Sequence, residues 1–153
     1  MQAAYYPPKG IRSGGGARLG LIGDSAADYF AHANDEILLA VMVESEAAIA
    51  RVEEIMRVPG VDVVLIGPGD LMIDVRANGH DEAHHERLVL QVAAAAQRTG
   101  TAAGYVCTTR AQAEERIAQG FRFINYGSDF GIIRAGFQRL LEDTRSLSGA
   151  QPG

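Results

Sequence analysis

Short apolar runs alternate with amphipathic segments through most of this 153-residue sequence, and this alternation does most to limit the folds open to the chain. Short runs of branched apolar residues are typical of strands that are buried on both faces. The amphipathic segments carry apolar residues at spacings of three and four, which predicts helices. The expected strands are residues 37–43, 61–66, 101–107 and 121–126, and the expected helices are residues 45–58, 81–99, 109–119 and 130–147.

Four consecutive strand-helix units limit the architecture to two kinds. Each helix is long enough to cross over between strands, so the strands are expected to be parallel, with right-handed connections. Part of a (β/α)₈ barrel and an open doubly wound sheet both fit this pattern. A complete barrel typically needs about 250 residues, so this chain would supply about half of one. The expected fold class is α/β.

The sequence divides into three expected regions. Residues 1–36 form an N-terminal loop with one short helix at residues 24–34, and residues 37–146 form the four units. Residues 147–153 form a flexible tail. Serine and glycine are frequent near both ends, which is typical of linkers.

Helix boundaries are marked by capping residues and by glycine. Ser45 and Thr109 are expected N-caps because their hydroxyls accept hydrogen bonds from first-turn N–H groups. Gly100 is expected to end the helix that precedes it. Residues 67–70, Gly-Pro-Gly-Asp, are expected to form a turn, and residues 72–80 a loop.

Charge and cysteine content argue against several classes of protein. A net charge of −5 argues against nucleic acid or an anionic membrane as the main partner, because both favour basic patches. One cysteine, Cys107, allows neither an intrachain disulfide nor a thiolate metal cluster. The longest apolar run, residues 37–43, is too short to cross a bilayer, and the first residues lack the apolar core of a signal peptide. A cytoplasmic protein is expected.

Polar residues follow the carboxyl ends of the strands, where both architectures collect their functional groups. Glu44 follows the first strand and Asp70 the second, and neighbouring parallel strands lie only about 4.8 Å apart. Both carboxylates can therefore reach one small cation. Mg²⁺ or Mn²⁺ prefers oxygen ligands and often takes only one or two protein carboxylates. The other residues at strand ends are Gly67, Pro68, Gly69, Cys107, Thr108, Gly127, Ser128 and Asp129.

Each of these acids has a structural alternative. Glu44 stands beside the helix that begins after Ser45, where an acid is favourable, and spacing alone leaves this role and metal binding equally open. Asp70 fits an ordinary turn residue as well. Asp129 is expected to cap the last helix.

The histidines and the cysteine favour structural roles. His80 and His84 lie four residues apart near an expected helix start, where a metal site has no obvious third ligand. This segment is expected to be the solvated beginning of a helix. Cys107 is expected to be a small apolar core residue, because no histidine or asparagine partner for a nucleophile stands out.

Four motifs in order resemble the C-terminal portion of the pyruvate-dependent class II aldolases. They are YYPPKGIRSGG, VMVES, PGVDVVLIGPGDL and FRFINYGSD. These metal-dependent enzymes include the 4-hydroxy-2-oxoheptanedioate and 2-keto-3-deoxy-sugar-acid aldolases, and they are related to the citrate lyase β subunit. The resemblance extends from Tyr6 to the last helix.

The resemblance implies the C-terminal half of a (β/α)₈ TIM barrel, usually oligomeric, in which Glu44 and Asp70 hold Mg²⁺ or Mn²⁺. It also implies that the N–H groups of Gly69 and Asp70 receive the carboxylate of pyruvate, while the ion chelates the carboxylate and keto oxygens. The ion would act as a Lewis acid in the cleavage of 2-keto-acid aldols to pyruvate and an aldehyde. No Schiff-base lysine is needed, and the single lysine is Lys9 in the proline-rich loop.

The sequence departs from the family pattern in three places. The family's proton-transferring histidine, and the arginine that polarises the keto oxygen, belong to the first half of the barrel, so no catalytic residue is assigned in this chain. Met42 stands where a glutamine is frequent, and Tyr5 where an arginine is common. A four-stranded piece also has open edges and an uncovered face, so it needs a partner. A fragment, a half-barrel that pairs with a copy of itself or with a separate N-terminal half, and a degenerate relative are all open.

Two other functions fit the same residues. A non-catalytic half-barrel for assembly or regulation would keep the fold without the acid–base groups. A citrate-lyase-like enzyme acting on an acyl-CoA fits less well, because no basic cleft for the nucleotide is evident and the GPGDL turn resembles the aldolase branch.

Overall fold

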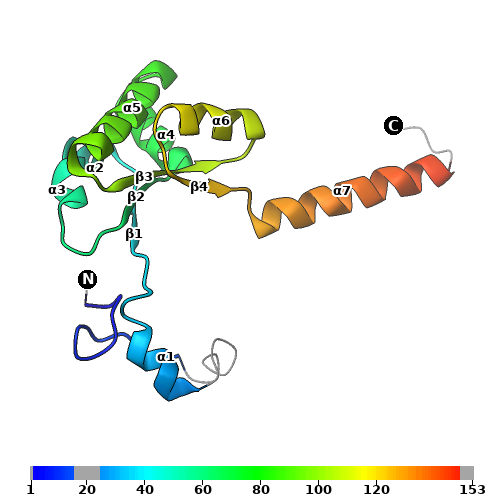
Figure 1. Ribbon diagram of the computed structural model, residues 1–153. Coiled ribbons are helices and arrows are strands. Elements are labelled where there is room, and N and C mark those ends of the chain that lie inside the picture. The colour runs from blue at the N-terminus through cyan, green and yellow to red at the C-terminus, as the bar shows by residue number, and fades with distance from the viewer. Residues whose placement is uncertain (1, 16–24, 149–153) are drawn as a thin grey trace.

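The computed structural model describes residues 2–15 and 25–148, and its centre is a sheet of four parallel strands in the order β1-β2-β3-β4 (Figure 1). The strands are Ala40–Val43, Val63–Ile66, Ala102–Cys107 and Phe123–Tyr126. All four expected strands are confirmed, and each begins one to three residues later than the apolar run that predicted it. Sequential order with parallel pairing is the arrangement of a barrel segment and not of a doubly wound sheet, whose order reverses at a switch point.

Helices alternate with the strands as the apolar spacing predicts. Ser45, Asp81 and Thr109 each accept a hydrogen bond from a first-turn N–H group, which confirms Ser45 and Thr109 as N-caps. Gly100 ends its helix in the left-handed conformation, with φ of 79°, which glycine adopts without strain. The helices outside the 68–77 segment are α1 Ala26–His32, α2 Glu46–Ala50, α3 Val52–Met56, α5 Glu82–Thr99, α6 Arg110–Ala118 and α7 Asp129–Ser148.

The structure corrects the expected turn and loop after β2. Residues Pro68–Ala77 form the helix α4, with Gly67 as its N-cap. Proline is well suited to the first position of a helix, where no backbone N–H is needed. Leu71 and Val75, four residues apart, are fully buried and anchor this helix to the core. The Gly-Pro-Gly sequence therefore begins a helix instead of forming a free turn.

Two smaller corrections concern helix continuity and capping. The single helix expected at 45–58 is divided at Arg51, whose φ of −110° and ψ of 16° leave the helical region. The bend directs both Ile49 and Val52 into the core against α5. At the start of α7, Ser128 Oγ accepts the hydrogen bond from Gly131 N–H at 3.0 Å, so Ser128 provides the cap that was expected from Asp129.

The helices α2 to α6 cover one face of the sheet, called the outer face here, and the main hydrophobic core lies beneath them. Burying one large aliphatic side chain contributes about 1.5–3 kcal/mol, so this core is the main source of stability. The buried strand residues of the outer face are Val43, Val64, Ile66, Ala103, Tyr105 and Cys107. Burial raises the pKa of the Cys107 thiol, in keeping with its expected role as a core residue.

The opposite face, called the inner face here, carries a row of residues in register. Met42, Leu65, Gly104 and Phe123 pair across the four strands. A Cβ built on Gly104 would lie 2.9 Å from Leu65 Cδ1 and 3.1 Å from Phe123 Cδ1, so the neighbouring side chains fill the space over the glycine. Such layers fill the interior of a (β/α)₈ barrel. Met42 is 51% exposed, so the inner face is open at the β1 edge.

Two segments lie apart from this core. The N-terminal residues pack on α1 through Tyr6, whose backbone exchanges two hydrogen bonds with the Asn34 side chain. The helix α7 extends away from the sheet (Figure 1), and its large apolar side chains are 56–88% exposed. Residues 147 and 148, expected to begin a flexible tail, belong to α7, and the other residues of the expected tail, 149–153, lie outside the described residues. Within residues 2–15 and 25–148, no helix combines the length and apolar character needed to cross a membrane.

Candidate functional site

The carboxyl ends of β1 and β2 bring Glu44 and Gly67 side by side. Val43 pairs with Ile66, and the Gly67 N–H donates to the Val43 carbonyl oxygen at 3.2 Å. Because side chains alternate along a strand, Glu44 lies on the same face as Met42, which is the inner face. Glu44 thus follows the row of inner-face residues at the end of the sheet where barrel enzymes hold their active sites.

The Glu44 side chain lies over the backbone of Gly67. A Cβ built on Gly67 would overlap the Glu44 Oε1 atom and would lie 3.0 Å from its Cδ. The glycine therefore provides the space that the carboxylate occupies. Gly67 is itself buried, so a larger residue would displace Glu44 instead of turning toward solvent.

Glu44 lacks a partner within the described part of the chain. The half-buried acids Glu46, Glu53, Asp74 and Glu86 each accept hydrogen bonds. Glu44 has the same intermediate burial but makes no hydrogen bond or ion pair with residues 2–15 or 25–148. The Glu44 carboxylate is therefore free to bind a cation without breaking a contact within the described residues.

The alternative role of Glu44 as a helix cap is not supported. Ser45 Oγ accepts the hydrogen bond from Ala48 N–H at 3.2 Å, so Ser45 provides the cap of α2. Glu44 contributes no hydrogen bond to that helix.

Asp70 and Gly69 lie in the first turn of α4, directly beyond β2. The first hydrogen bond inside this helix runs from Leu71 N–H to the Gly67 carbonyl at 3.0 Å, so the N–H groups of Gly69 and Asp70 have no partner within the helix. Both residues are exposed. Free N–H groups at a helix start bind anions such as carboxylates.

The glycine at position 69 is not explained by contacts within the protein. A Cβ built on Gly69 meets no described atom within 4 Å, and its φ is not positive. Neither packing nor backbone conformation requires a glycine here. The absence of a side chain leaves room for a ligand to approach the backbone closely.

Glu44 directly follows β1, while Gly69 and Asp70 lie in the helix turn that follows β2, so all three are at the same end of the sheet. Oxygen ligands from two carboxylates suit Mg²⁺ or Mn²⁺, which often take only one or two protein carboxylates. The residues present fit such an ion, since Glu44 lacks a partner and lies in a space kept open by Gly67.

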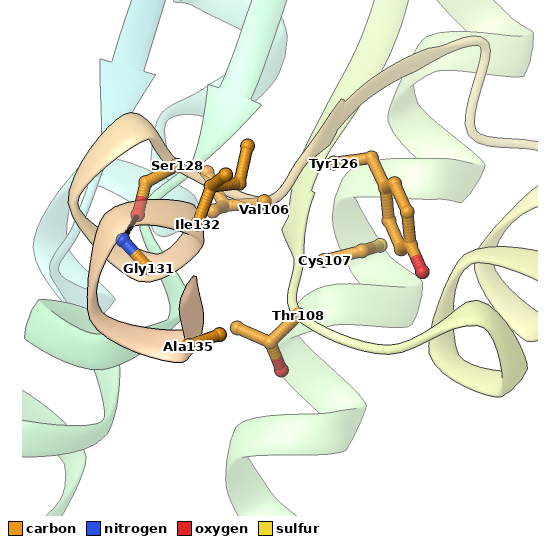
Figure 2. A pocket seen from close by; sticks show the side chains of 9 residues that line it. Val106, Cys107, Thr108, Tyr126, Ser128, Gly131, Ile132 and Ala135 are labelled. Carbon is orange, nitrogen blue, oxygen red and sulfur yellow. Dashed lines mark hydrogen bonds between the residues drawn. The ribbon is translucent and has the colours of Figure 1, made fainter. Parts of the chain in front are cut away.

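A pocket of about 440 Å³ lies at the other side of the same end of the sheet, between the ends of β3 and β4 and the first turns of α7 (Figure 2). It does not include Glu44 or Asp70. Figure 2 shows Thr108 and Ala135 on one side and Tyr126 near Cys107 on the other. Its lining residues are Val106, Cys107, Thr108, Tyr126, Gly127, Ser128, Gly131, Ile132 and Ala135.

The structure gives His80 and His84 a partner that sequence reasoning missed. Glu46 Oε1 lies 2.9 Å from His80 Nδ1, and Glu46 Oε2 lies 3.2 Å from His84 Nε2. The hydrogen bond from His80 is the main factor that lowers the pKa of the Glu46 carboxyl, and burial opposes it. These histidines are therefore more than a solvated helix beginning. No short-range pattern links them to Glu46, which lies 34 and 38 residues away.

Comparison with known proteins agrees with this arrangement. The sequence profile described as HpcH/HpaI aldolase/citrate lyase matches residues 1–135. The chain belongs to the HpcH/HpaI aldolase/citrate lyase family. The expected fold, half of a (β/α)₈ barrel, and the expected relationship to keto-acid aldolases and citrate lyase are confirmed.

Two curated relatives and one solved structure show how far the similarity extends. A 5-keto-4-deoxy-D-glucarate aldolase of Klebsiella pneumoniae subsp. pneumoniae is 34% identical over 146 residues, covering 93% of this chain and 56% of the relative. A hydroxypyruvate/pyruvate aldolase of Rhizorhabdus wittichii is 32% identical over 151 residues, covering 95% and 58%. The crystal structure of a family protein from Burkholderia cenocepacia J2315 aligns with a TM-score of 0.74 at 28% identity, covering 94% and 58%. The chain thus spans little more than half the length of these relatives.

Proposed function

We propose that this chain forms the metal-binding and keto-acid-binding half of an aldolase that cleaves 2-keto-acid aldols to pyruvate and an aldehyde. The observation that carries this proposal is the half-buried, unpartnered Glu44 over Gly67, next to the open first turn of α4. Relatives described as aldolases for keto-acid substrates support it.

Glu44 and Asp70 are the residues that would hold the divalent ion, Mg²⁺ or Mn²⁺. Such an ion supplies Lewis-acid stabilisation of the negative charge that develops on a keto oxygen. Glu44 contributes a carboxylate on the inner face, and Asp70 contributes one from the start of α4. Neither carboxylate is committed to another side chain of the described chain, so neither must break a contact to bind.

The first turn of α4 would bind the carboxylate of the keto acid. The N–H groups of Gly69 and Asp70 point out of the helix start, and the helix dipole adds a partial positive charge there. Gly69 leaves room for the ligand to approach the backbone. These contacts orient the keto acid and hold it at the end of the sheet.

Cleavage also requires groups that take the proton from the aldol hydroxyl and protonate the resulting enolate, and we assign none of them in this chain. The inner face is open at Met42, and a complementary half-barrel would both cover it and bring such groups to the site. The exposed apolar side chains of α7 favour assembly of several copies as well. We therefore propose a homo-oligomer or a complex with a complementing half as the active form.

Binding of Mn²⁺ to the 153-residue chain tests this proposal without relying on turnover. Electron paramagnetic resonance measures the free Mn²⁺ that remains as the protein is added. We expect Glu44→Gln and Asp70→Asn each to weaken Mn²⁺ binding by roughly tenfold or more, the cost of losing one charged ligand. The matched control is Glu82→Gln, an exposed acid in the first turn of α5, which is expected to leave binding unchanged.

The same titration distinguishes a metal- and pyruvate-binding aldolase half from a non-catalytic assembly module. Pyruvate is expected to tighten Mn²⁺ binding in the wild-type chain, because linked ligands strengthen each other reciprocally. Wild-type Mn²⁺ affinity in Asp70→Asn would contradict the proposed site. Oligomer formation without Mn²⁺ or pyruvate binding would favour a non-catalytic assembly module instead.

A further inference from the structure

Three potential metal ligands from separate elements converge beside the start of α2. Glu46 is the first residue of α2, His80 lies between α4 and α5, and His84 lies in the first turn of α5. One ligand atom from each lies within 4.8 Å of the other two. The two imidazole rings are stacked at a tilt, with centroids 4.1 Å apart.

The spacing of these atoms is close to that of a coordination sphere. Metal–nitrogen and metal–oxygen bonds of about 2.0–2.1 Å in a tetrahedral site place neighbouring ligand atoms about 3.3 Å apart. Glu46 Oε1 lies 2.9 Å from His80 Nδ1, and Glu46 Oε2 lies 3.2 Å from His84 Nε2. Both histidines thus approach the Glu46 carboxylate at ligand-like distances, and the three ligand atoms, within 4.8 Å of one another, would draw closer together around a bound ion.

We propose that Glu46, His80 and His84 form a binding site for Zn²⁺, separate from Glu44 and Asp70. Two imidazole nitrogens and one carboxylate suit a borderline ion of this class, whereas Mg²⁺ and Mn²⁺ prefer sites made of oxygen. Three protein ligands leave a fourth position for water. The chain would then bind a hard ion at the end of the sheet and a borderline ion beside α2.

Backbone hydrogen bonds hold the two helix starts that carry Glu46 and His84. Glu46 N–H donates to Asp74 Oδ2 at 2.8 Å, and Asp81 Oδ1 accepts from His84 N–H at 2.9 Å. These bonds fix the starts of α2 and α5 independently of the ligand side chains. The Glu46 side chain is only 22% exposed, so little side-chain freedom is lost when it binds an ion.

Arg87 determines which nitrogen of His84 carries the proton before an ion binds. Its guanidinium donates to His84 Nδ1 at 3.1 Å, so that nitrogen is an acceptor and Nε2 carries the proton that faces Glu46. Coordination through Nε2 moves the proton of the neutral ring to Nδ1, which cannot then accept from Arg87. The exposed Arg87 must turn away, and its positive charge opposes the ion. Arg87 is therefore expected to weaken Zn²⁺ binding.

Bound Zn²⁺ would link the start of α2 to the start of α5. A ligand that binds only the folded chain raises its stability in proportion to the logarithm of the free ligand concentration. Zn²⁺ is therefore expected to raise the unfolding temperature of the chain. Glu46→Gln keeps the shape of the side chain and is expected to remove most of this increase.

Calorimetric titration of the full chain with Zn²⁺ in saturating Mg²⁺ tests the site, with Mg²⁺ occupying Glu44 and Asp70. We expect His80→Ala and His84→Ala each to weaken binding at least roughly tenfold, and Arg87→Gln to tighten it several-fold. His32→Ala is the matched control, because His32 is an exposed histidine beside an acid, Asp28, and is expected to change nothing. Nitrogen chemical shifts of the His80 and His84 rings should change on Zn²⁺ addition and not on Mg²⁺ addition.

Three results would overturn the proposal. They are wild-type affinity in both histidine variants, ring shifts that do not respond to Zn²⁺, and loss of Zn²⁺ binding in the double variant Glu44→Gln/Asp70→Asn. The last result would assign Zn²⁺ to the end of the sheet. This double variant removes only the proposed aldolase site. Retained Zn²⁺ binding in it would therefore support the Zn²⁺ site whether or not the proposed aldolase function holds.

Discussion

The Glu44 carboxylate occupies the space over Gly67 that a Cβ at that position would fill. This contact joins the ends of β1 and β2 on the inner face. It also couples the choice of residue at position 67 to the placement of the acid that we propose as a metal ligand. A substitution at Gly67 is therefore expected to move the Glu44 carboxylate.

The first prediction concerns Gly67→Ala. The added methyl group would displace the Glu44 carboxylate, so we expect Mn²⁺ affinity to fall by roughly tenfold, equivalent to about 1.4 kcal/mol. Electron paramagnetic resonance of free Mn²⁺ measures this, and circular dichroism checks that the chain remains folded. Unchanged Mn²⁺ affinity would show that the position of Glu44 does not matter for binding.

Gly69→Ala is expected to behave differently. Its Cβ meets no described atom, and alanine favours a helix over glycine by about 1 kcal/mol, so the free energy of unfolding should stay the same or rise slightly. Mn²⁺ binding should persist, while pyruvate should no longer tighten it, because the methyl group blocks the N–H groups at the helix start. Urea unfolding and Mn²⁺ titrations with and without pyruvate measure the two effects. Full retention of the pyruvate effect would contradict carboxylate binding at α4.

Local patterns were sufficient to predict most of the fold. The apolar runs predicted all four strands, and the strand-helix alternation predicted their parallel pairing, because both follow from residues close in sequence. The placement of Glu44 and Asp70 at one end follows from the same rule. The turn expected at Gly-Pro-Gly was wrong, because these residues also begin helices. The available signal for α4 was the pair of apolar residues Leu71 and Val75, which are four residues apart and buried.

Long-range packing explains what the sequence did not reveal. Glu46 approaches His80 and His84 only because α2, α4 and α5 pack together, and no local spacing encodes that contact. The bend at Arg51 likewise depends on how Ile49 and Val52 both reach the core. Such features become visible only when distant segments are brought together.

Leu71→Ala tests whether α4 is a packed helix. Leu71 is fully buried, so its truncation should lower the free energy of unfolding by about 2–5 kcal/mol. Ile73→Ala, in the same helix but 67% exposed, is the matched control and should cost less than about 0.5 kcal/mol. Urea unfolding measures both. Equal effects would indicate that residues 68–77 do not pack as a helix against the core.

The ion pair of Glu86 and Arg116 predicts a dependence of stability on pH. Arg116 is 6% exposed, and its Nη2 donates to Glu86 Oε2 at 2.7 Å. This hydrogen bond is the main factor that holds the pKa of Glu86 below its ordinary value of 4.5. A lowered folded-state pKa gives stability that is present above pH 4.5 and is lost as the pH falls toward the folded value.

Glu86→Gln should remove that contribution. We expect the variant to be less stable than wild type by about 2 kcal/mol at pH 7, below the 3–5 kcal/mol of a fully buried pair because Glu86 is partly exposed. The difference between the two chains should shrink below pH 4.5. Urea unfolding across this pH range measures it, and Glu114→Gln, in the exposed pair with Arg110, is the control. A constant difference at all pH values would contradict the assignment.

The last prediction concerns α7 and self-association. Phe137 and Leu141 lie four residues apart on this helix and are 64% and 56% exposed, so they share an apolar face that is favourable to cover. We expect the wild-type chain to sediment as an oligomer, and the double variant Phe137→Ser/Leu141→Ser to shift toward the monomer. The matched control, Gln138→Ser/Glu142→Ser, has the same spacing on the same helix and should sediment as wild type. A wild-type chain that stays monomeric at all concentrations in sedimentation velocity would rule out assembly through this face.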